Sequence, residues 1–359
     1  MRILITDDSV FMRSAIGRAL AEQPDFEIVG KARHGREAVE LAKQLRPDVV
    51  TMDIEMPEMD GLTALRQIMR QSPTQVLMCS TLTTEGSRQS LQALRMGAAD
   101  VIPKETSPRP AARKLFLEDL IRRVRGLGES SRHRPTAPPH TPGVEPTAAP
   151  NPTQASDPTP TLDTHRFELL CIASSTGGPP VLETLLTAMP ATLRLPVVIG
   201  QHMPRIFTQS MAERFNDICP LPVVHAEHRT TLEPGRVYIA PGGQHTHIER
   251  ASLAQCRLKI NDEPRDALYK PSADALFSSA AEACGSRVLG VILTGIGDDG
   301  LRGAGQLHKA GAPILAQSQR TCVVYGMPRA VAQAGYATAS LDPEAIAATL
   351  QQLAPRAAA

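Results

Sequence analysis

The sequence predicts an α/β protein with two domains, each built around a parallel or mainly parallel β-sheet. Short apolar runs alternate with helical patterns through residues 1–127, and the same alternation resumes in residues 165–355. This alternation is typical of doubly wound sheets, because each helix carries the chain back to add the next parallel strand. The chain's 359 residues also exceed the ~250–300 at which a single core usually stops growing. We therefore expect two separate cores.

The first half of the chain predicts a flavodoxin-like domain with a five-stranded parallel sheet. The apolar runs that we expect to form strands are residues 2–6, 26–30, 47–53, 75–80 and 99–104. The helical patterns that follow the first four of them are residues 14–23, 36–45, 62–70 and 88–97. A regular succession of strand and helix is what a doubly wound parallel domain requires.

Residues 128–164 are expected to be a linker between the two domains. This segment is crowded with Pro, Thr, Ala and Ser and has almost no apolar periodicity. Proline fixes φ and favours extended polyproline geometry, so a segment of this composition acts as a semi-stiff spacer and does not pack into a core.

The second half predicts a doubly wound, Rossmann-like domain with a mainly parallel sheet. Its candidate strands are residues 167–174, 195–202, 221–228, 236–243, 286–295 and 311–318. Residues 245–261 differ, because HTHIER and CRLKIN alternate across a turn in the pattern of an antiparallel hairpin. We expect the hairpin to join the sheet, which would make this second sheet mixed.

Composition argues against several classes of function. Lys and Arg total 38 against 37 Asp and Glu, so the formal charge of +1 gives no electrostatic basis for binding nucleic acid. The six cysteines are scattered without a C-x-x-C pair, which predicts buried, reduced thiols. The chain begins without a basic leader, and no apolar run approaches the roughly 20 residues that span a bilayer. We expect a cytoplasmic protein that is not inserted into a membrane.

Acidic side chains gather at the predicted strand ends of the first domain. The first strand ends at Asp7 and Asp8, the third at Asp53 and the fourth at Ser80, while Lys104 follows the fifth. The carboxyl ends of parallel strands share one edge, where three carboxylates repel one another unless a cation compensates them. Oxygen ligands favour Mg²⁺. With Mg²⁺ and Lys104 neutralising charge, Asp53 could accept a phosphoryl group. The alternative is that these acids merely cap helices.

The combination of these residues is far more specific than a lone Asp-Asp pair. The segments DDS and PDVVTMDIEMPEMDG, with a serine and a lysine at later strand ends, resemble the response-regulator receiver family over residues 1 to about 125. The resemblance implies that Asp7, Asp8 and Asp53 bind Mg²⁺ and that Asp53 is phosphorylated. It also implies that Ser80 and Lys104 make the contacts that switch the domain.

A serine in the second domain has the placement of a nucleophile. In CIASSTGGPP an apolar run ends at Ser175 in a glycine-rich turn, and a Pro-Pro pair then begins a helical pattern. The strand therefore delivers Ser175 to the sheet edge where ligands bind. A serine hydroxyl needs a base within hydrogen-bond reach and a third group that orients the base. His202 and Asp299 also follow predicted strands and are the candidates for these two roles.

Other histidines compete with His202 for the role of base. They are His225, His228, His245 and His247. The last two could share one face of a strand as a weak metal-binding pair, although no cysteine or acid at a suitable spacing strengthens that interpretation.

The segment GIGDDG offers a different interpretation of the second domain. Gly295, Gly297 and Gly300 match the dinucleotide-binding pattern G-x-G-x-x-G after a strand and before a helix. However, Asp298 and Asp299 would lie where the pyrophosphate should meet helix amides, and no acid near residue 317 is available to hold a ribose. This argues against a dinucleotide.

Taken together, six segments of the second domain resemble the CheB family of chemotaxis methylesterases. They are IASSTGGP, QHMPRIFT, YIAPGG, KPSADALF, LTGIGDDG and VVYGMPRA. The resemblance implies that Ser175 is the nucleophile, His202 the general base and acid, and Asp299 the carboxylate that orients it. It places the oxyanion site near Thr176 and Ile296. The order Ser, His, Asp differs from that of α/β-hydrolases, and the G-x-S-x-G elbow is absent.

The resemblance implies an enzyme that removes methyl groups from glutamate γ-methyl esters on methyl-accepting chemoreceptors, releasing methanol, and that also deamidates receptor glutamines. It implies a chemotaxis histidine kinase as phosphodonor, Mg²⁺ in the receiver and no cofactor for the esterase reaction. The unmodified receiver would cover the cleft until Asp53 is phosphorylated. We interpret Gly177-Gly178 as clearance for a receptor helix. Two alternatives remain: a receiver-controlled serine esterase or amidase of another pathway, and a binding module without catalysis.

Overall fold

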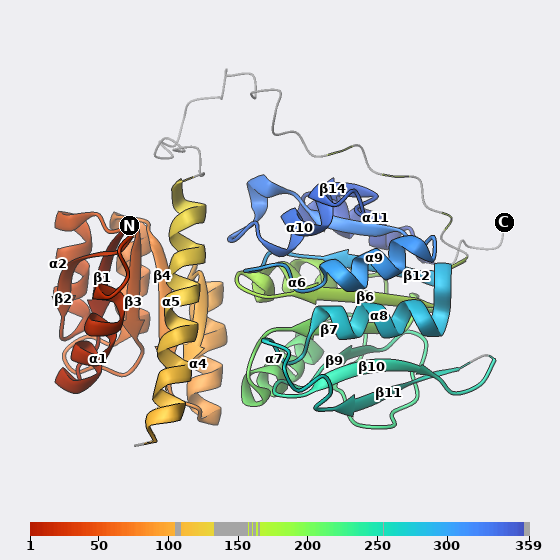
Figure 1. The fold of residues 1–359 in the computed structure, drawn as a ribbon, viewed down its shortest axis with the longest axis horizontal. Helices are drawn as coiled ribbons and strands as arrows, with labels where there is room; N and C mark the ends of the chain where they lie inside the picture. The colour runs from red at the N-terminus through yellow and green to blue at the C-terminus, as the bar shows by residue number, and fades with distance from the viewer. Residues whose placement is uncertain are drawn as a thin grey trace.

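The computed structural model describes residues 1–104, 109–132, 166–253 and 255–354, together with residues 157, 160 and 163. Within them the chain forms two α/β domains that lie side by side, and helices α4 (Thr84–Arg95) and α5 (Pro110–Arg132) of the first domain face the second (Figure 1). Most of the predicted linker, residues 128–164, lies outside the described residues. Its first five residues continue helix α5.

The first domain is a five-stranded parallel sheet in the order β2-β1-β3-β4-β5, which confirms the predicted flavodoxin-like fold. Its strands are β1 (Arg2–Thr6), β2 (Glu27–Ala32), β3 (Val49–Asp53), β4 (Gln75–Ser80) and β5 (Asp100–Pro103). Helices α1 (Val10–Ala21) and α5 cover one face, and α2 (Gly35–Leu45), α3 (Gly61–Gln71) and α4 cover the other. Because β1 and β3 are neighbours, the acids at their ends lie side by side.

Side-chain caps start three of these helices close to the strand ends. The side chains of Ser9, Asp60 and Thr83 accept hydrogen bonds from first-turn amides of α1, α3 and α4. Each cap of this kind stabilises a helix by about 1 kcal/mol. Early helix starts keep the loops after β1 and β4 to three residues each, so the polar residues of those loops have fixed positions.

The second domain contains a seven-stranded sheet in the order β14-β13-β12-β6-β7-β9-β8, and every neighbouring pair is parallel. The strands are β6 (Leu169–Ser174), β7 (Val197–Gln201), β8 (Val223–His225), β9 (Val237–Ile239), β12 (Val288–Ile292), β13 (Ile314–Gln317) and β14 (Ala339–Leu341). This confirms the doubly wound fold. The pattern predicts no strand at β14, because its segment, Ala339–Leu341, is not a run of large apolar residues.

The predicted hairpin forms, but the expectation that it makes the main sheet mixed is wrong. Strands β10 (His245–Arg250) and β11 (Cys256–Asn261) pair antiparallel in a separate two-stranded sheet. The hairpin packs against helix α8 (Ala273–Cys284), where Ile248 and Leu258 share a core with Phe277. A helix therefore covers its apolar face, and the hairpin needs no partner strand in the main sheet.

Helices cover both faces of the main sheet. Helices α6 (Gly178–Thr187), α7 (Arg205–Ile218) and α11 (Pro343–Gln351) pack on one face, and α8, α9 (Leu301–Lys309) and α10 (Met327–Gln333) on the other. Two short 3-10 helices, η2 (Gly285–Arg287) and η3 (Gln319–Thr321), complete the described elements. All six cysteines are free thiols, and four of them are buried. No helix in the described part of the chain is long and apolar enough to cross a membrane.

The strand order creates a crevice at the carboxyl end of β6. From β6 the chain proceeds to β7 on one side, and it later returns to the other side of β6 to form β12. In open α/β sheets ligands bind at such a reversal of strand order, because the loops on its two sides diverge. The loops after β12, β6 and β7 leave three adjacent strands, so the residues that they carry converge on this crevice.

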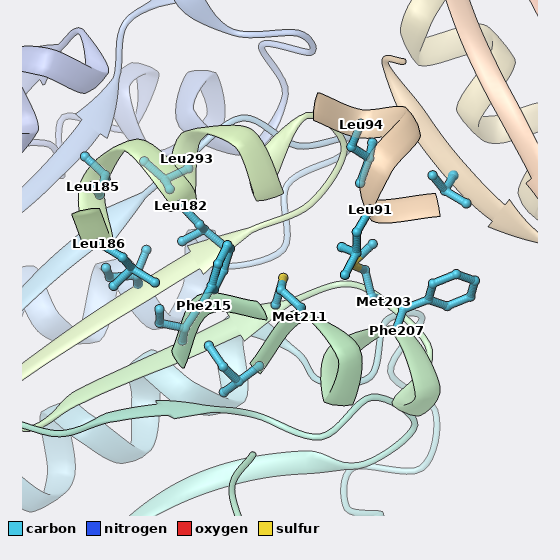
Figure 2. Packing of buried hydrophobic residues seen from close by; sticks show 14 of the residues in the cluster. Leu91, Leu94, Leu182, Leu185, Leu186, Met203, Phe207, Met211, Phe215 and Leu293 are labelled. Atoms are coloured by element: carbon cyan, nitrogen blue, oxygen red, sulfur yellow. The ribbon is translucent and has the colours of Figure 1, made fainter. Parts of the chain in front are cut away.

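The two domains meet across an interface that includes packed apolar side chains. Leu91 and Leu94 of α4 pack beside Met211 of α7 (Figure 2). A polar contact lies within this packing, where the hydroxyl oxygens of Ser87 in α4 and Ser210 in α7 are 2.6 Å apart and both side chains are buried. The first domain is therefore docked on the second through a packed surface.

Candidate active site

Ser175 lies directly after β6, at the carboxyl end of the strand. Its amide donates to the Thr294 carbonyl at 3.0 Å, and its carbonyl accepts from Gln201 Nε2 at 2.9 Å, so neighbouring strands fix the backbone of the turn. Only 3% of the residue is exposed, and its hydroxyl bonds to none of the described residues. The backbone of Ser175 is thus held in place, and its hydroxyl remains available to react.

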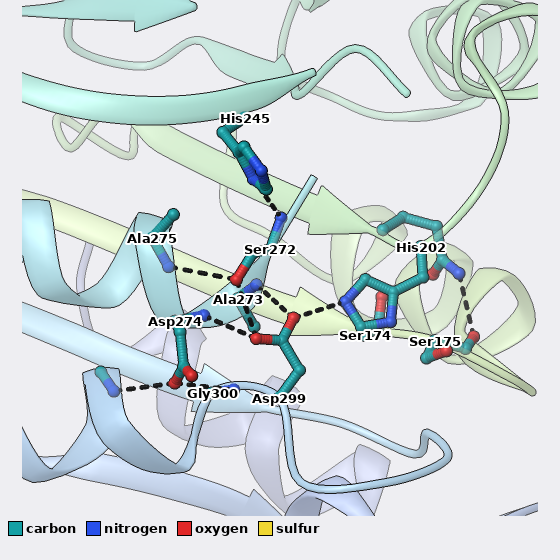
Figure 3. Close-up of polar contacts among 12 residues, drawn as sticks. Ser174, Ser175, His202, His245, Ser272, Ala273, Asp274, Ala275, Asp299 and Gly300 are labelled. Carbon is teal, nitrogen blue, oxygen red and sulfur yellow. Dashed lines mark hydrogen bonds and ion pairs between the residues drawn. The ribbon is translucent and has the colours of Figure 1, made fainter. Parts of the chain in front are cut away.

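His202 lies directly after β7, and its imidazole occupies the space between Asp299 and the turn that carries Ser175 (Figure 3). Its Nε2 is 2.8 Å from Oδ2 of Asp299. Because a carboxylate accepts this hydrogen bond, Nε2 carries the ring proton and Nδ1 keeps a lone pair. Nδ1 is buried and has no partner among the described residues. Buried acceptors in folded proteins are normally satisfied, so this nitrogen awaits a donor.

The amino-terminal turn of α8 holds Asp299 in place. Oδ1 accepts from Ser272 Oγ at 2.8 Å and from the Asp274 amide at 3.1 Å, while Oδ2 accepts from the Ala273 amide at 2.6 Å and from His202. Burial disfavours the charged carboxylate, but the hydrogen bond from His202 and those from the amides outweigh it and lower the pKa of Asp299 to about 2. Asp299 is therefore an anion near neutral pH and fixes the tautomer of His202.

Ser175, His202 and Asp299 are brought together by strand order. They follow β6, β7 and β12, which are adjacent in the sheet with β6 in the middle. A hydroxyl, an imidazole with a free lone pair and a buried carboxylate are the groups required for general-base-assisted attack by a serine. This set of groups fits acyl transfer.

The amides of Thr176 and Ile296 are candidates for stabilising an oxyanion. Neither amide donates a hydrogen bond within the described residues, whereas the amide of Ser175 is already bonded. Both residues are buried in the turns that follow β6 and β12. Amides without partners beside a serine hydroxyl are the kind of donor that a tetrahedral intermediate of acyl transfer requires.

Gly177 and Gly178 serve internal packing, so their interpretation as clearance for a receptor helix is wrong. Gly177 has a φ of 78°, and a Cβ at this position would lie 2.5 Å from the Cβ of Val323. A Cβ on Gly178 would clash with the Gln201 side chain. The turn therefore needs glycine for its left-handed backbone and for the close approach of neighbouring side chains.

The four competing histidines are engaged elsewhere. His225 faces a threonine hydroxyl at 3.0 Å, and one ring nitrogen each of His228 and His247 contacts a backbone group. Backbone groups contact both ring nitrogens of His245, so His245 and His247 do not offer a pair of free nitrogens to a metal ion. Among the described residues, the acidic cluster of the first domain is the one group of side chains spaced for a metal ion.

A carboxylate fills the place that the pyrophosphate of a dinucleotide would take. Asp274 Oδ1 accepts from the amides of Gly300 and Gly303, at 3.0 and 2.9 Å, at the start of α9. Its other oxygen lies 2.8 Å from the guanidinium of Arg302. The helix terminus is thus already neutralised by the protein, which argues against the dinucleotide interpretation.

The predicted acidic cluster forms at the edge of the first sheet. One oxygen from each of Asp7, Asp8 and Asp53 lies within 4.8 Å of the others. Lys104 Nζ is 2.7 Å from Asp7 and 2.5 Å from Asp53. Burial still raises the pKa of Asp53 to about 6, since Lys104 compensates the charge only in part. Carboxylate oxygens whose charge is incompletely compensated fit a hard divalent cation such as Mg²⁺.

Ser80 connects the acidic cluster to helix α4. Its hydroxyl donates to the carbonyl of Gly86 at 3.0 Å, in the first turn of that helix. The next residue, Ser87, makes the buried contact with the second domain. Any change at the cluster that moves the Ser80 hydroxyl therefore acts on a helix that belongs to the domain interface.

The first domain covers the crevice of the second. The Thr176 hydroxyl donates to the carboxylate of Asp100 in β5. Gly126 of α5 lies so close to Ile296 that a Cβ there would come within 2.9 Å of the isoleucine side chain. The surface of the first domain thus contacts the turns after both β6 and β12, and Ser175 between them is enclosed.

Sequence reasoning missed three residues that support the site. Gln201 accepts from Ser174 Oγ at 2.6 Å and donates to the Ser175 carbonyl, Ser272 holds Asp299, and Tyr269 stacks on His202. Ser272 had a usable signal, because a serine before a helical pattern is a typical helix cap. Glutamine and tyrosine carry no such signal, since their partners are distant in sequence.

Two family models match the chain. One, described as CheB methylesterase, matches residues 170–350, and the other, described as response regulator receiver domain, matches residues 3–115. Together they cover both cores of the fold.

Relatives along nearly the whole chain carry one kind of name. The protein-glutamate methylesterase/protein-glutamine glutaminase of Alkalilimnicola ehrlichii is 42% identical, over 93% of this chain and 95% of its own. The protein-glutamate methylesterase/protein-glutamine glutaminase 1 of Oleidesulfovibrio alaskensis is also 42% identical, over 95% of this chain and 96% of its own. The crystal structure of the Thermotoga maritima CheB methylesterase catalytic domain is 36% identical, covers 52% of this chain and 98% of that one, and gives a TM-score of 0.50.

Proposed function

Because the chain belongs to the CheB methylesterase family and carries a response regulator receiver domain, we propose that it is a phosphorylation-activated protein-glutamate methylesterase. It hydrolyses glutamate γ-methyl esters on the cytoplasmic helices of methyl-accepting chemoreceptors and releases methanol. It also deamidates receptor glutamines, with ammonia as the leaving group. It acts in the cytoplasm during chemotaxis adaptation, and a chemotaxis histidine kinase supplies its phosphoryl group.

The reaction uses Ser175, His202 and Asp299 in two half-reactions. Nδ1 of His202 takes the hydroxyl proton of Ser175 as its oxygen attacks the ester carbonyl carbon, and the amides of Thr176 and Ile296 stabilise the oxyanion. Collapse breaks the bond to the methoxy oxygen, which leaves as methanol with the proton from His202. Water then attacks the acyl-enzyme by the same route and releases glutamate, and Asp299 stabilises the imidazolium in both steps.

One observation carries this proposal above the others. The Nδ1 atom of His202 is buried without a partner, while its Nε2 is fixed by an ionised Asp299. A histidine that serves only to support the fold would have both nitrogens satisfied. This geometry favours a base that awaits a proton donor. It therefore favours a catalytic domain over a binding module without catalytic activity.

The first domain supplies the regulation. Asp7, Asp8 and Asp53 would hold Mg²⁺, which neutralises charge on a transferring phosphoryl group. Asp53 accepts the phosphoryl group, whose oxygens draw the Lys104 ammonium and the Ser80 hydroxyl toward them. The Ser80 hydroxyl then leaves the Gly86 carbonyl, which loosens the first turn of α4 and shifts the equilibrium toward a released receiver.

Methanol release from methylated receptor membranes tests this function. We expect the full chain to release methanol, and acetyl phosphate with Mg²⁺ to raise the rate several-fold by shifting the docking equilibrium. Asp53→Asn should keep the basal rate and lose the increase, because its side chain cannot accept the phosphoryl group. Turnover of a simple ester without turnover of receptors would favour an esterase of another pathway. Turnover of neither substrate would favour the binding module.

The Ser87–Ser210 contact gives a separate test of docking. Ser87→Ala leaves the Ser210 hydroxyl buried without its interdomain partner, which costs about 1 kcal/mol or more and should raise the basal esterase rate about 5-fold. Ser210→Ala should raise the basal rate less, because the Ser87 hydroxyl still donates to the Thr84 carbonyl at 2.7 Å. The double variant replaces both polar groups, so its basal rate should return toward that of the wild type. Equal activation in the single and double variants would contradict the docked arrangement.

A further inference from the structure

The phenol ring of Tyr269 lies flat against the imidazole of His202. The two ring centres are 4.3 Å apart and the ring planes differ by 5°. Tyr269 is in the loop between β11 and α8, three residues before the Ser272 that caps α8 and bonds to Asp299. One short segment therefore contacts both the base and the carboxylate that orients it.

The stack restricts a motion that the carboxylate leaves free. The hydrogen bond from Nε2 to Asp299 fixes one end of the imidazole, but a single hydrogen bond allows the ring to rotate about the axis of that bond. Contact with the flat face of Tyr269 limits that rotation. Nδ1, which is buried and has no other partner among the described residues, then keeps one direction within the crevice.

The same ring face would attract an imidazolium formed on His202. An aromatic face carries negative charge density and attracts cations, more strongly in a desolvated site. Burial raises the pKa of the Tyr269 hydroxyl, so the ring stays a neutral phenol near neutral pH. Proton transfer from Ser175 would create an imidazolium against this face, so the stacking attraction grows when the base is protonated.

The docked receiver also contacts this ring. The guanidinium of Arg122, in α5, lies 5.7 Å from the ring centre of Tyr269. A second cation at the ring competes for the same negative charge density and repels an imidazolium. The other charged groups that face the stack are Asp299, on Nε2 of His202, and Arg123 and Asp119 of α5. The Asp119 carboxylate pairs with Arg122 at 3.1 Å and with Arg123 at 2.9 Å, so it compensates the charge of Arg122 in part.

We propose that Tyr269 is a positioning residue for His202: its ring fixes the imidazole plane and supports the imidazolium, and Arg122 of the docked receiver opposes that support. The receiver then inhibits in two ways, by covering Ser175 and by making His202 a weaker proton acceptor. This inference rests on the proposed role of His202 as the base.

Exchange of Tyr269 tests the first part in the full chain activated with acetyl phosphate. We expect Tyr269→Leu to lower the midpoint of the His202 ring titration, followed by NMR, by about half a pH unit or more, because the cation–π attraction is lost. The acid limb of the kcat/KM profile should move to lower pH with it, and kcat should fall while KM changes little. Tyr269→Phe, which keeps the ring face, should restore the midpoint, the profile and kcat.

The outcomes distinguish a specific role of the aromatic ring face from simple packing. They also do not depend on the proposed function. An unchanged titration midpoint in Tyr269→Leu, or an equal shift in Tyr269→Phe, would overturn the positioning role. The titration requires no turnover, so it decides this even if receptor esters are not substrates. A folded chain is checked through the His245 resonances, since that ring bonds to the same loop and to Ser272.

Exchange of Arg122 tests the second part. In the unphosphorylated chain, Arg122→Gln should raise the His202 midpoint, whereas Arg122→Lys, which keeps the positive charge, should raise it less. In the phosphorylated chain, where α5 has moved away, neither variant should change the midpoint. A rise of equal size in both phosphorylation states, or no rise in either, would contradict an effect of the docked receiver on His202.

Discussion

Replacing Ser175 with alanine is expected to lower kcat for methanol release by about 10⁶-fold, the loss typical of removing a serine nucleophile that acts with its base. The oxyanion donors and the substrate-binding surface would remain, so a small residual rate above that of water is expected. Structure should be little affected, because the Ser175 hydroxyl bonds to none of the described residues. The measurement is methanol release from methylated receptor membranes in the presence of a phosphodonor.

Ser174 provides a matched control for this substitution. It is the adjacent residue, it is also a buried serine, and its hydroxyl donates to Gln201 Oε1 at 2.6 Å. Ser174→Ala removes one hydrogen bond that supports the turn, worth about 1 kcal/mol, and should lower activity far less than Ser175→Ala does. If Ser174→Ala lost activity while Ser175→Ala kept it, the nucleophile would be Ser174 and the assignment to Ser175 would be wrong.

Local patterns were sufficient to place the candidate residues at strand ends. An apolar run followed by a polar turn marks the end of a buried strand, and Ser175, His202 and Asp53 lie at such ends, whereas Asp299 lies in the loop between β12 and α9. Their convergence is a different matter, because the order of strands in a sheet depends on long-range pairing. Only the arrangement β12-β6-β7 shows that three loops from distant parts of the sequence meet around one serine.

Features with distant partners could not be predicted. The alternation in HTHIER and CRLKIN gives the local pairing of the hairpin correctly, but its packing on α8 depends on a helix that the hairpin pattern cannot indicate. The same holds for Tyr269, whose ring contacts His202 across 67 positions of sequence. The contact of Ser87 with Ser210 likewise joins two domains whose relative placement no local pattern encodes.

Asp299→Asn is expected to lower kcat about 10⁴-fold, the effect known for a triad aspartate replaced by its amide. The amide oxygen of asparagine, in the place of Oδ1, can still accept from the Ser272 hydroxyl and the Asp274 amide, whereas the NH₂ group takes the place of Oδ2 and loses the bond from the Ala273 amide. Its NH₂ group would then face Nε2 of His202 and donate to it. The ring proton would have to move to Nδ1, which leaves no lone pair to receive the proton of Ser175. Asp298→Asn, at the exposed neighbouring carboxylate, is the control and should retain activity.

The same variant should change how stability depends on pH. The pKa of Asp299 is about 2 in the folded chain against an ordinary 3.8, so the folded state favours the ionised form, and this stabilisation is complete well above pH 4 and is lost as pH falls through about 2. Between pH 5 and pH 3, wild type should lose about 1 kcal/mol of unfolding free energy relative to Asp299→Asn. Urea denaturation followed by tyrosine fluorescence can measure this, because all four tyrosines, Tyr238, Tyr269, Tyr325 and Tyr336, lie in the second domain. A constant difference across this pH range would show that the hydrogen bonds to Asp299 do not favour its charged form.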